Sequence, residues 1–302
     1  MGRWLLSPYL LLAVTALCWS GNHILARAMR TDLPPMAMAF WRWVIAAAVL
    51  LPFLGPTLWQ HRAIISQHWR LLVLLAASGL ALNHGFLYLA LHATTAINTG
   101  LIIATTPIMI PLVALTLDRK LITLRQAAGI AVSLVGVVII ITRADTEALS
   151  GLRFAAGDLY AVVTAATWAI YSVLLRRMPR ELPPLVFLLA LAVLAVLLLL
   201  PFYCWEAVAV AGFAPTAQNL LALAYMGLFP SIVAYVCWNE GVAQVGPTKA
   251  GPTQYLIPVF TVVLAVSLLD EVIRPFHVVG AALAIFGVYL ATSRRLALPG
   301  GA

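Results

Sequence analysis

Charged residues are scarce in this 302-residue chain, making up only 9% of it, with ten acidic and 18 basic side chains. A soluble domain carries about 25% charged residues, so this composition excludes an ordinary soluble protein. The three cysteines, Cys18, Cys204 and Cys237, have no metal-ligand spacing, and we expect neither a metal site nor a disulfide. With 63% hydrophobic residues and a mean hydropathy of +1.01, the chain is expected to reside in a membrane.

Motifs for catalysis and nucleotide binding are also missing. There is no Gly-x-x-x-x-Gly-Lys-Ser/Thr loop, so ATP is not expected to be a direct energy source. A Gly-x-Ser-x-Gly turn or an Asp-rich cluster would suit an intramembrane enzyme, and neither is found. We therefore expect no enzymatic activity and no cofactor.

Apolar stretches of about 20 residues, the length that crosses a bilayer, recur from end to end. A β-barrel would need alternating apolar and polar residues, which the stretch 188–200 lacks. The sequence therefore predicts an all-α polytopic fold with ten transmembrane helices and short linkers, including one over 204–218. The expected helices are 7–27, 36–56, 70–91, 97–117, 122–142, 156–176, 183–203, 218–239, 248–269 and 275–293.

Basic residues are distributed unevenly between the two ends of these helices. With the N-terminus in the cytoplasm, twelve of the 18 Lys and Arg residues fall on the cytoplasmic side and five outside, while Arg42 lies within the second helix. Cytoplasmic loops carry the excess of positive charge in membrane proteins. We therefore expect both termini in the cytoplasm, and the net charge of +8 requires no nucleic-acid partner.

The chain contains an internal duplication. Residues 14–35 and 163–184 align without a gap at an offset of 149, and Trp19, Arg27 and Pro35 have identical counterparts in Trp168, Arg176 and Pro184. Further on, the offset becomes 151. We expect two five-helix repeats, 1–150 and 151–302. Because five is odd, the second repeat enters the membrane upside down, as in many secondary transporters with a binding site near the midplane.

Polar and aromatic side chains within the spans occupy matched positions in both repeats. Polar groups in hydrocarbon usually face a cavity or another helix. Asn22 and His23 lie on the same helix face as Trp19 and correspond to Tyr171 and Ser172, while His84 and Tyr88 correspond to Tyr235 and Asn239. We therefore expect a central substrate cavity between the repeats. Its candidate residues are Trp19, Asn22, His23, Asn83, His84, Tyr88, Asn98, Trp168, Tyr171, Tyr235, Trp238, Asn239, Gln254 and Tyr255.

Each candidate also has an ordinary structural explanation. A single intramembrane Trp or Tyr is more often a packing residue or an interfacial anchor. His84 suits a hydrogen-bonded core position as well as a cavity, and Glu240 is either an interfacial carboxylate or a proton-linked group at the cytoplasmic gate. Arg42 is expected to snorkel outward or to pair with an acid such as Asp32, and Asp158 to cap its helix. Four histidines near loops are interpreted as surface residues: His61, His68, His92 and His277.

Prolines and glycines are matched between the repeats as well. Pro107 and Pro258 remove a backbone hydrogen bond from the fourth and ninth helices, and symmetric bending there is the expected gate. Gly136 and Gly287, one pair of several, allow the fifth and tenth helices to approach closely. We expect those helices to act as scaffold, or as the contact of a homodimer if the protein is not a monomer.

Several landmarks recur along the chain: Trp19, Arg27 with Pro34-Pro35, Gly157-Asp158, and Pro258 followed by Asp270-Glu271. Together these landmarks resemble the drug/metabolite transporter superfamily and, within it, the ten-helix EamA-type exporters, which include an aromatic amino-acid exporter. The resemblance covers nearly the whole chain. It implies export of amino acids and other small metabolites across the inner membrane of a bacterium, by alternating access between inverted halves.

Two other functions remain open at this point: a passive, channel-like facilitator and a drug-cation exporter of the same superfamily. The near absence of acidic residues within the spans argues against an obligate polycation carrier. Aromatic rings accommodate an apolar side chain or, by cation–π attraction, an ammonium group. We therefore expect neutral or aromatic amino acids and similar amphipathic metabolites as substrates.

Overall fold

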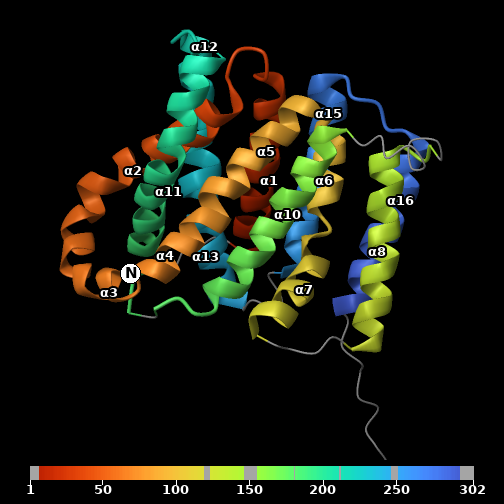
Figure 1. The fold of residues 1–302 in the computed structure, drawn as a ribbon, viewed down its shortest axis with the longest axis horizontal. Helices are drawn as coiled ribbons and strands as arrows, with labels where there is room; N and C mark the ends of the chain where they lie inside the picture. Colours follow the sequence, from red (N-terminus) through yellow and green to blue (C-terminus); the bar gives the residue numbers. More distant parts are fainter. Residues whose placement is uncertain are drawn as a thin grey trace, which may run out of the picture.

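The computed structural model describes residues 7–118, 123–145, 155–179, 181–210, 212–245 and 251–292, and these contain helices and no strand (Figure 1). The expected boundary between the repeats, at residues 150 and 151, and several basic residues of the topology count, such as Lys249, lie outside the described residues. The all-helical membrane fold predicted from the sequence is confirmed.

Ten apolar passages, each a helix or a bent helix pair, are found among the described residues. Seven are helices long and apolar enough to cross a membrane, a bent pair makes an eighth, and two shorter apolar helices complete the set. The first half contains α1 (Pro8–Ala28), α2 (Pro35–Gln60), the short α3 (Arg62–Gln67), α4 with η1 and α5 (Trp69–Leu75, Ala76–Ala81, Leu82–Ala93), α6 with α7 (Ala96–Ile103, Thr106–Asp118) and α8 (Leu124–Thr142). The second contains α10 (Ala156–Leu175), α11 (Pro184–Ala209), α12 with η2 and α13 (Ala217–Leu228, Phe229–Val233, Ala234–Val245), η3 with α15 (Gly251–Tyr255, Leu256–Leu269) and α16 (Pro275–Thr292).

The two halves repeat the same irregularities. Helices α2 and α11 each have 26 residues and begin at the matched prolines Pro35 and Pro184. The third and eighth passages are each interrupted by a π-helical turn, η1 and η2, at overlapping repeat positions. Such turns occur often at functional sites, because they rotate one part of a helix against the other. The sequence duplication is thus accompanied by a duplication of local geometry.

The sequence predicted a linker over 204–218. This prediction is wrong for the first part of that range, because α11 continues to Ala209. Glu206, in the last turns of α11, accepts hydrogen bonds from the backbone N–H groups of Met36 at 3.1 Å and Ala37 at 2.8 Å. These are unpaired donors at the start of α2, where a negative charge is favourable. The last turns of α11 therefore place the Glu206 carboxylate against the start of α2.

The matched prolines lie where helix geometry changes. Helices α6 and α7 form one passage bent by 44°. Pro107 offers no N–H to the carbonyl of Ile103, and the Thr106 hydroxyl donates to that oxygen instead, at 2.6 Å. In the second half, Pro258 lies just after the 3-10 turn η3. Gating at these positions stays a prediction.

Helices α8 and α16 form a closely packed pair at one side of the bundle (Figure 1). A Cβ atom on Gly136 would lie 2.5 Å from the Gly280 carbonyl oxygen, and one on Gly287 would lie 2.5 Å from that of Gly129. The backbones therefore touch, as the glycine pattern predicted.

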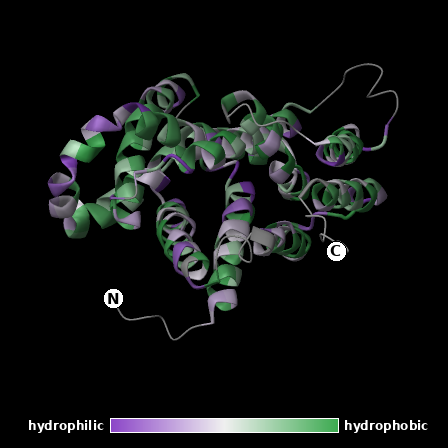
Figure 2. Cartoon of the chain, turned by 90° about the horizontal axis from the view of Figure 1, so that it is seen from below, coloured by the Kyte–Doolittle hydropathy of each residue, from purple (hydrophilic) through white to green (hydrophobic). Residues whose placement is uncertain are grey.

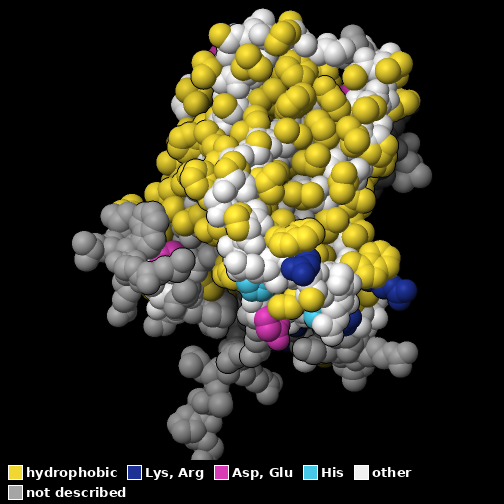
Figure 3. All heavy atoms as spheres, turned by 90° about the vertical axis from the view of Figure 1, so that its left-hand side faces the viewer, with side chains coloured by type: hydrophobic (Ala, Val, Ile, Leu, Met, Phe, Trp, Pro, Cys, Tyr) yellow, Lys and Arg dark blue, Asp and Glu magenta, His cyan; other side chains and the backbone are white. Residues whose placement is uncertain are grey.

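Apolar residues run along most helices (Figure 2). On the face shown in Figure 3, a broad apolar surface ends at a lower region where Lys, Arg and His side chains gather. This is the surface of a protein surrounded by lipid.

Candidate functional site

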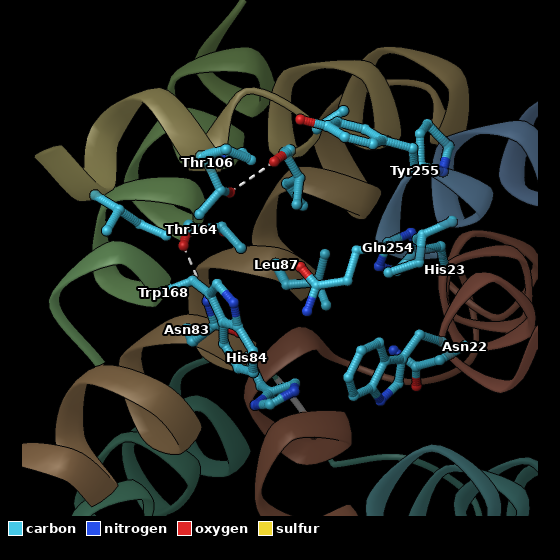
Figure 4. A pocket seen from close by; sticks show the side chains of 18 of the residues that line it. Asn22, His23, Asn83, His84, Leu87, Thr106, Thr164, Trp168, Gln254 and Tyr255 are labelled. Carbon is cyan, nitrogen blue, oxygen red and sulfur yellow. Dashed lines mark hydrogen bonds between the residues drawn. The ribbon is translucent and has the colours of Figure 1, made fainter. Parts of the chain in front are cut away.

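Two adjoining cavities lie between the halves. The first has a volume of about 480 Å³ and the second about 530 Å³. The first is lined by residues of α1, α2, α5, α6, α7, α10, α13, η3 and α15, and Figure 4 shows side chains from several of these helices around the same space. The cavities share seven lining residues: Trp19, Thr106, Pro107, Ile110, Trp168, Tyr235 and Gln254.

Aromatic rings from both halves meet where the cavities join. The ring centroids of Trp19 and Trp168 are 6.3 Å apart, and those of Trp19 and Tyr235 are 6.1 Å apart, both edge to face. Trp238 lies 6.0 Å from Trp19 on the side of the second cavity. The Trp19 indole N–H donates to the Pro230 carbonyl in η2 at 3.1 Å, so the π-helical turn fixes this ring. We call these four rings the aromatic cluster: Trp19, Trp168, Tyr235 and Trp238.

The structure brings most of the candidates from the sequence into these cavities. Six of them line only the first cavity: Asn22, His23, Asn83, His84, Tyr255 and Pro258. Three line only the second: Tyr171, Trp238 and Asn239. Trp19, Trp168, Tyr235, Gln254 and Pro107 line both. Three candidates line neither cavity: Tyr88, Asn98 and Glu240.

Tyr88 is fully buried behind the first cavity. Its hydroxyl donates to Oδ1 of Asn22 at 2.9 Å and accepts from Nη1 of Arg42 at 3.1 Å. It therefore positions two lining residues rather than facing the cavity itself. Helix periodicity identified its side of the helix correctly, but it does not reveal which neighbour covers that side.

Arg42 is the residue that sequence reasoning missed. It neither snorkels outward nor pairs with Asp32, because it is only 1% exposed and lines the first cavity. Its Nε donates to the Ser231 hydroxyl at 2.8 Å, and its guanidinium lies 5.0 Å from the centre of the Trp43 ring. Its very presence within an apolar span was the available signal.

The two ends of the bundle differ. The second cavity is lined by Met178, Pro184 and Val242, so it extends toward the α10–α11 end, where residues 176–183 connect those helices. At the opposite α1–α2 end, where residues 29–34 make the connection, polar contacts join the helices.

Asp158 and His277 belong to these polar contacts, and the structure corrects what the sequence predicted for each. Asp158 is not an N-cap, since Ala155 has that position; its carboxylate accepts from Thr94 at 2.6 Å and from Asn98 at 3.1 Å. His277 is not a surface residue, being 6% exposed and bonded through Nε2 to the Asn98 side chain at 2.9 Å. Asn98 therefore connects α10 with α16 instead of lining a cavity. His61, His68 and His92, also interpreted as surface residues, are partly buried and bonded to backbone carbonyls.

Glu271 is more than a boundary charge at this same end. It accepts hydrogen bonds from the backbone N–H groups of Ala96 at 2.8 Å and Ile97 at 3.0 Å, at the start of α6. It also lies 3.8 Å from Arg27, whose guanidinium donates to the Leu91 carbonyl at 2.8 Å. The α1–α2 end is thus held by several polar contacts between the halves.

Glu240 lies on the half-buried part of α13 and accepts a hydrogen bond from Gln244 at 2.9 Å. Both residues lie on α13, one helical turn apart. In the part of the chain that the structure describes, no group of three or more His, Cys, Asp or Glu side chains is placed to hold a metal ion.

Comparison with known proteins identifies relatives that match more than nine tenths of the chain. A transporter from Archaeoglobus fulgidus is 30% identical over 293 residues, covering 95% of this chain and 98% of that protein. The inner membrane transporter YedA of Escherichia coli K12 is 26% identical over 93% of this chain and 89% of its own length. A probable terminal-alkyne amino-acid exporter from Streptantibioticus cattleyicolor is 37% identical, but only over 83 residues, 28% of each chain.

A solved crystal structure has the same fold, with a TM-score of 0.60, 23% identity, and coverage of 94% of this chain and 96% of that one. The family model for EamA-like transporters matches the chain twice, over residues 6–142 and 155–293. The two matches coincide with the halves that build the cavities. This chain is a membrane protein that belongs to the EamA-like transporter family.

Proposed function

We propose that this transporter exports neutral or aromatic amino acids and related small amphipathic metabolites. The observation that carries the proposal is the aromatic cluster at the junction of the two cavities. Rings from both halves provide apolar faces there, and Asn22, Asn83 and Gln254 add hydrogen-bonding groups. A cavity of about 480 Å³ lies within the range of small-molecule sites, which are mostly apolar with a few well-placed polar groups.

The lining of both cavities includes no Asp or Glu among the described residues. A binding site for a drug-like cation would be expected to offer a carboxylate, so the lining favours zwitterionic or anionic amphipathic substrates. The short match to a probable amino-acid exporter supports the same substrate class.

Transport proceeds by alternating access between the inverted halves, in a bacterial inner membrane with both termini in the cytoplasm. In that orientation the α10–α11 end is cytoplasmic and the α1–α2 end is external. The second cavity then receives substrate from the cytoplasm while the polar contacts around Asn98 and Glu271 keep the outer end closed. Exchanging the roles of the two halves would open the other side.

A proteoliposome panel of neutral, aromatic and cationic amino acids, with and without a pH gradient, tests the proposal. We expect saturable flux of neutral and aromatic amino acids and little flux of cationic ones. If no neutral or aromatic amino acid moves faster than in empty liposomes, the proposed substrate class is wrong. Stimulation by the pH gradient would identify the coupling as proton-linked.

A further inference from the structure

A buried positive charge lines the first cavity, and no acidic side chain among the described residues pairs with it. Arg42 is 1% exposed, and arginine stays protonated in proteins. A charge held inside a membrane protein is costly unless it is paired or serves a function. The question is therefore what Arg42 binds.

Its observed partners are all neutral: the Ser231 hydroxyl, the Tyr88 hydroxyl and the Trp43 ring. No ion pair of Arg42 with a described residue is found within 4.0 Å, whereas Arg27 lies 3.8 Å from Glu271 at the α1–α2 end. Nε and Nη1 of Arg42 are engaged, whereas no hydrogen bond from Nη2 is found within the described part of the chain. The guanidinium thus retains donors and an uncompensated charge at the cavity wall.

This charge is not a requirement of the repeated fold. At the offset of 149 that aligns α2 with α11, Arg42 corresponds to Leu191, which lines the second cavity. At the offset of 151 that aligns the π-helical turns, Ser231 corresponds to Leu80. The repeat counterpart of the Arg42–Ser231 pair is therefore an apolar pair, Leu191 of the second half and Leu80 of the first. The cation lines only the first cavity, which distinguishes that cavity from the second.

A second donor lies on the same wall. The Tyr88 hydroxyl donates to Oδ1 of Asn22, which leaves the amide nitrogen of Asn22 available to the cavity. His84 lines the cavity as well, but its Nδ1–H donates to the Leu80 carbonyl at 2.8 Å, so the neutral ring adds an acceptor and not a donor. A guanidinium flanked by the amide donor of Asn22 matches the two oxygens of a carboxylate.

We propose that Arg42, supported by Asn22, binds the carboxylate of the transported molecule, so that the substrates are amphipathic monocarboxylates. The apolar part of the substrate then lies against Trp19, Trp168 and Tyr235. An α-ammonium group is tolerated but not required, and an amine without a carboxylate is rejected by the Arg42 charge. This inference rests on the proposed function, because it assigns a substrate group to the same cavity.

Ligand binding to the purified wild-type protein tests this without any variant. Quenching of tryptophan fluorescence compares leucine with 4-methylpentanoate, which lacks the ammonium, and 3-methylbutylamine, which lacks the carboxylate. We expect the acid to bind within a few-fold of leucine, and the amine about tenfold or more weaker, the value of one charge-assisted hydrogen bond. An amine that binds as well as the acid would overturn the proposal.

Different outcomes would overturn the carboxylate site and the proposed export of amino acids. If leucine and the amine bind but the acid does not, amino-acid export survives and the carboxylate site is wrong. If the acid binds while no amino acid is transported, the carboxylate site stands and the export of amino acids is wrong.

Two variants separate recognition from folding. Arg42→Gln is expected to weaken the binding of 4-methylpentanoate about tenfold or more. It should also reduce the preference for the acid over the amine and leave membrane insertion intact. Arg42→Lys should retain part of the preference. Arg62→Gln, on exposed α3, is the matched control. If Arg42→Gln does not fold, Tyr88→Phe removes one anchor of the guanidinium and should reduce the preference by a smaller factor. A folded Arg42→Gln protein with the wild-type preference would contradict the proposal.

Discussion

At the scale of single residues, long-range contacts decide what the cavity becomes. Arg42 bonds to Ser231 and Tyr88, which are 189 and 46 residues away in the chain, and Tyr88 continues the network to Asn22. One buried guanidinium thereby connects α1, α2, α5 and η2. Each of these polar groups is hydrogen-bonded to another, which makes the network rigid, while Nη2 of Arg42 and the amide nitrogen of Asn22 stay available at the cavity.

The same contacts show where sequence reasoning reached its limit. Trp19 and Trp168 were identifiable because the duplication preserves both, and the structure places both at the junction of the cavities. Asn98 looked equivalent by spacing, yet it bonds to Asp158 and His277 from other helices. Periodicity indicates a helix face, but only the packing of distant segments determines what that face meets.

Trp168→Ala is expected to reduce transport of aromatic and neutral amino acids about tenfold while the protein still inserts. The substitution removes an edge-to-face partner of Trp19 and joins the two cavities into a wider space. Initial rates in proteoliposomes measure the effect. Trp205→Ala, at a ring that is 67% exposed on α11, is the matched control and should transport normally. Wild-type rates for Trp168→Ala would remove the aromatic cluster from the substrate path.

At the scale of helices, the duplication is visible as repeated irregularity. The π-helical turns η1 and η2 overlap in the repeat, and η2 supplies both the Pro230 carbonyl that fixes Trp19 and the Ser231 hydroxyl that fixes Arg42. The sequence predicted the helices well, because long apolar runs are a strong signal. It did not predict the π turns or the extension of α11 to Glu206, since both depend on contacts with neighbouring helices.

The pairing of α8 with α16 is sensitive to one methyl group. Gly287→Ala places a Cβ atom 2.5 Å from both the Gly129 carbonyl oxygen and the Ser133 backbone nitrogen. We expect a loss of about 1–3 kcal/mol in stability, because backbone atoms cannot rotate away. Thermal unfolding in detergent measures the change.

Gly55→Ala is the matched control, because its Cβ atom meets only the Leu51 side chain, at 3.6 Å. In a helix interior this change should raise stability by about 0.5–1 kcal/mol. Two glycine substitutions in apolar helices thus have opposite expected signs. Equal melting temperatures for the two variants would contradict the close contact between α8 and α16.

At the scale of the whole molecule, inverted halves enclose an asymmetric site. The frame repeats in α2 and α11, but the first cavity has Arg42 where the second has Leu191. One end of the bundle is held by Glu271 and Asp158, while the second cavity extends toward the other end. Composition and charge predicted the membrane fold, whereas the closure of one end could not be predicted without the structure.

Cysteine labelling tests the orientation of the molecule. Thr31→Cys, in the exposed α1–α2 connection, should react with an impermeant maleimide added to intact cells. Ser66→Cys, on exposed α3, should react only after the membrane is opened, because the excess of positive charge predicts that this side faces the cytoplasm. Exposed Cys204 is replaced by Ser in both backgrounds. The reverse labelling pattern would overturn the orientation.

Counterflow tests the central claim, amino-acid transport by alternating access through the shared cavity. Proteoliposomes loaded with unlabelled phenylalanine or leucine are diluted into a trace of the labelled amino acid. We predict transient accumulation of label that saturates with substrate concentration and is strongly reduced in Trp168→Ala. Flux that does not saturate and is not stimulated by substrate on the opposite side would contradict the account and indicate a passive channel.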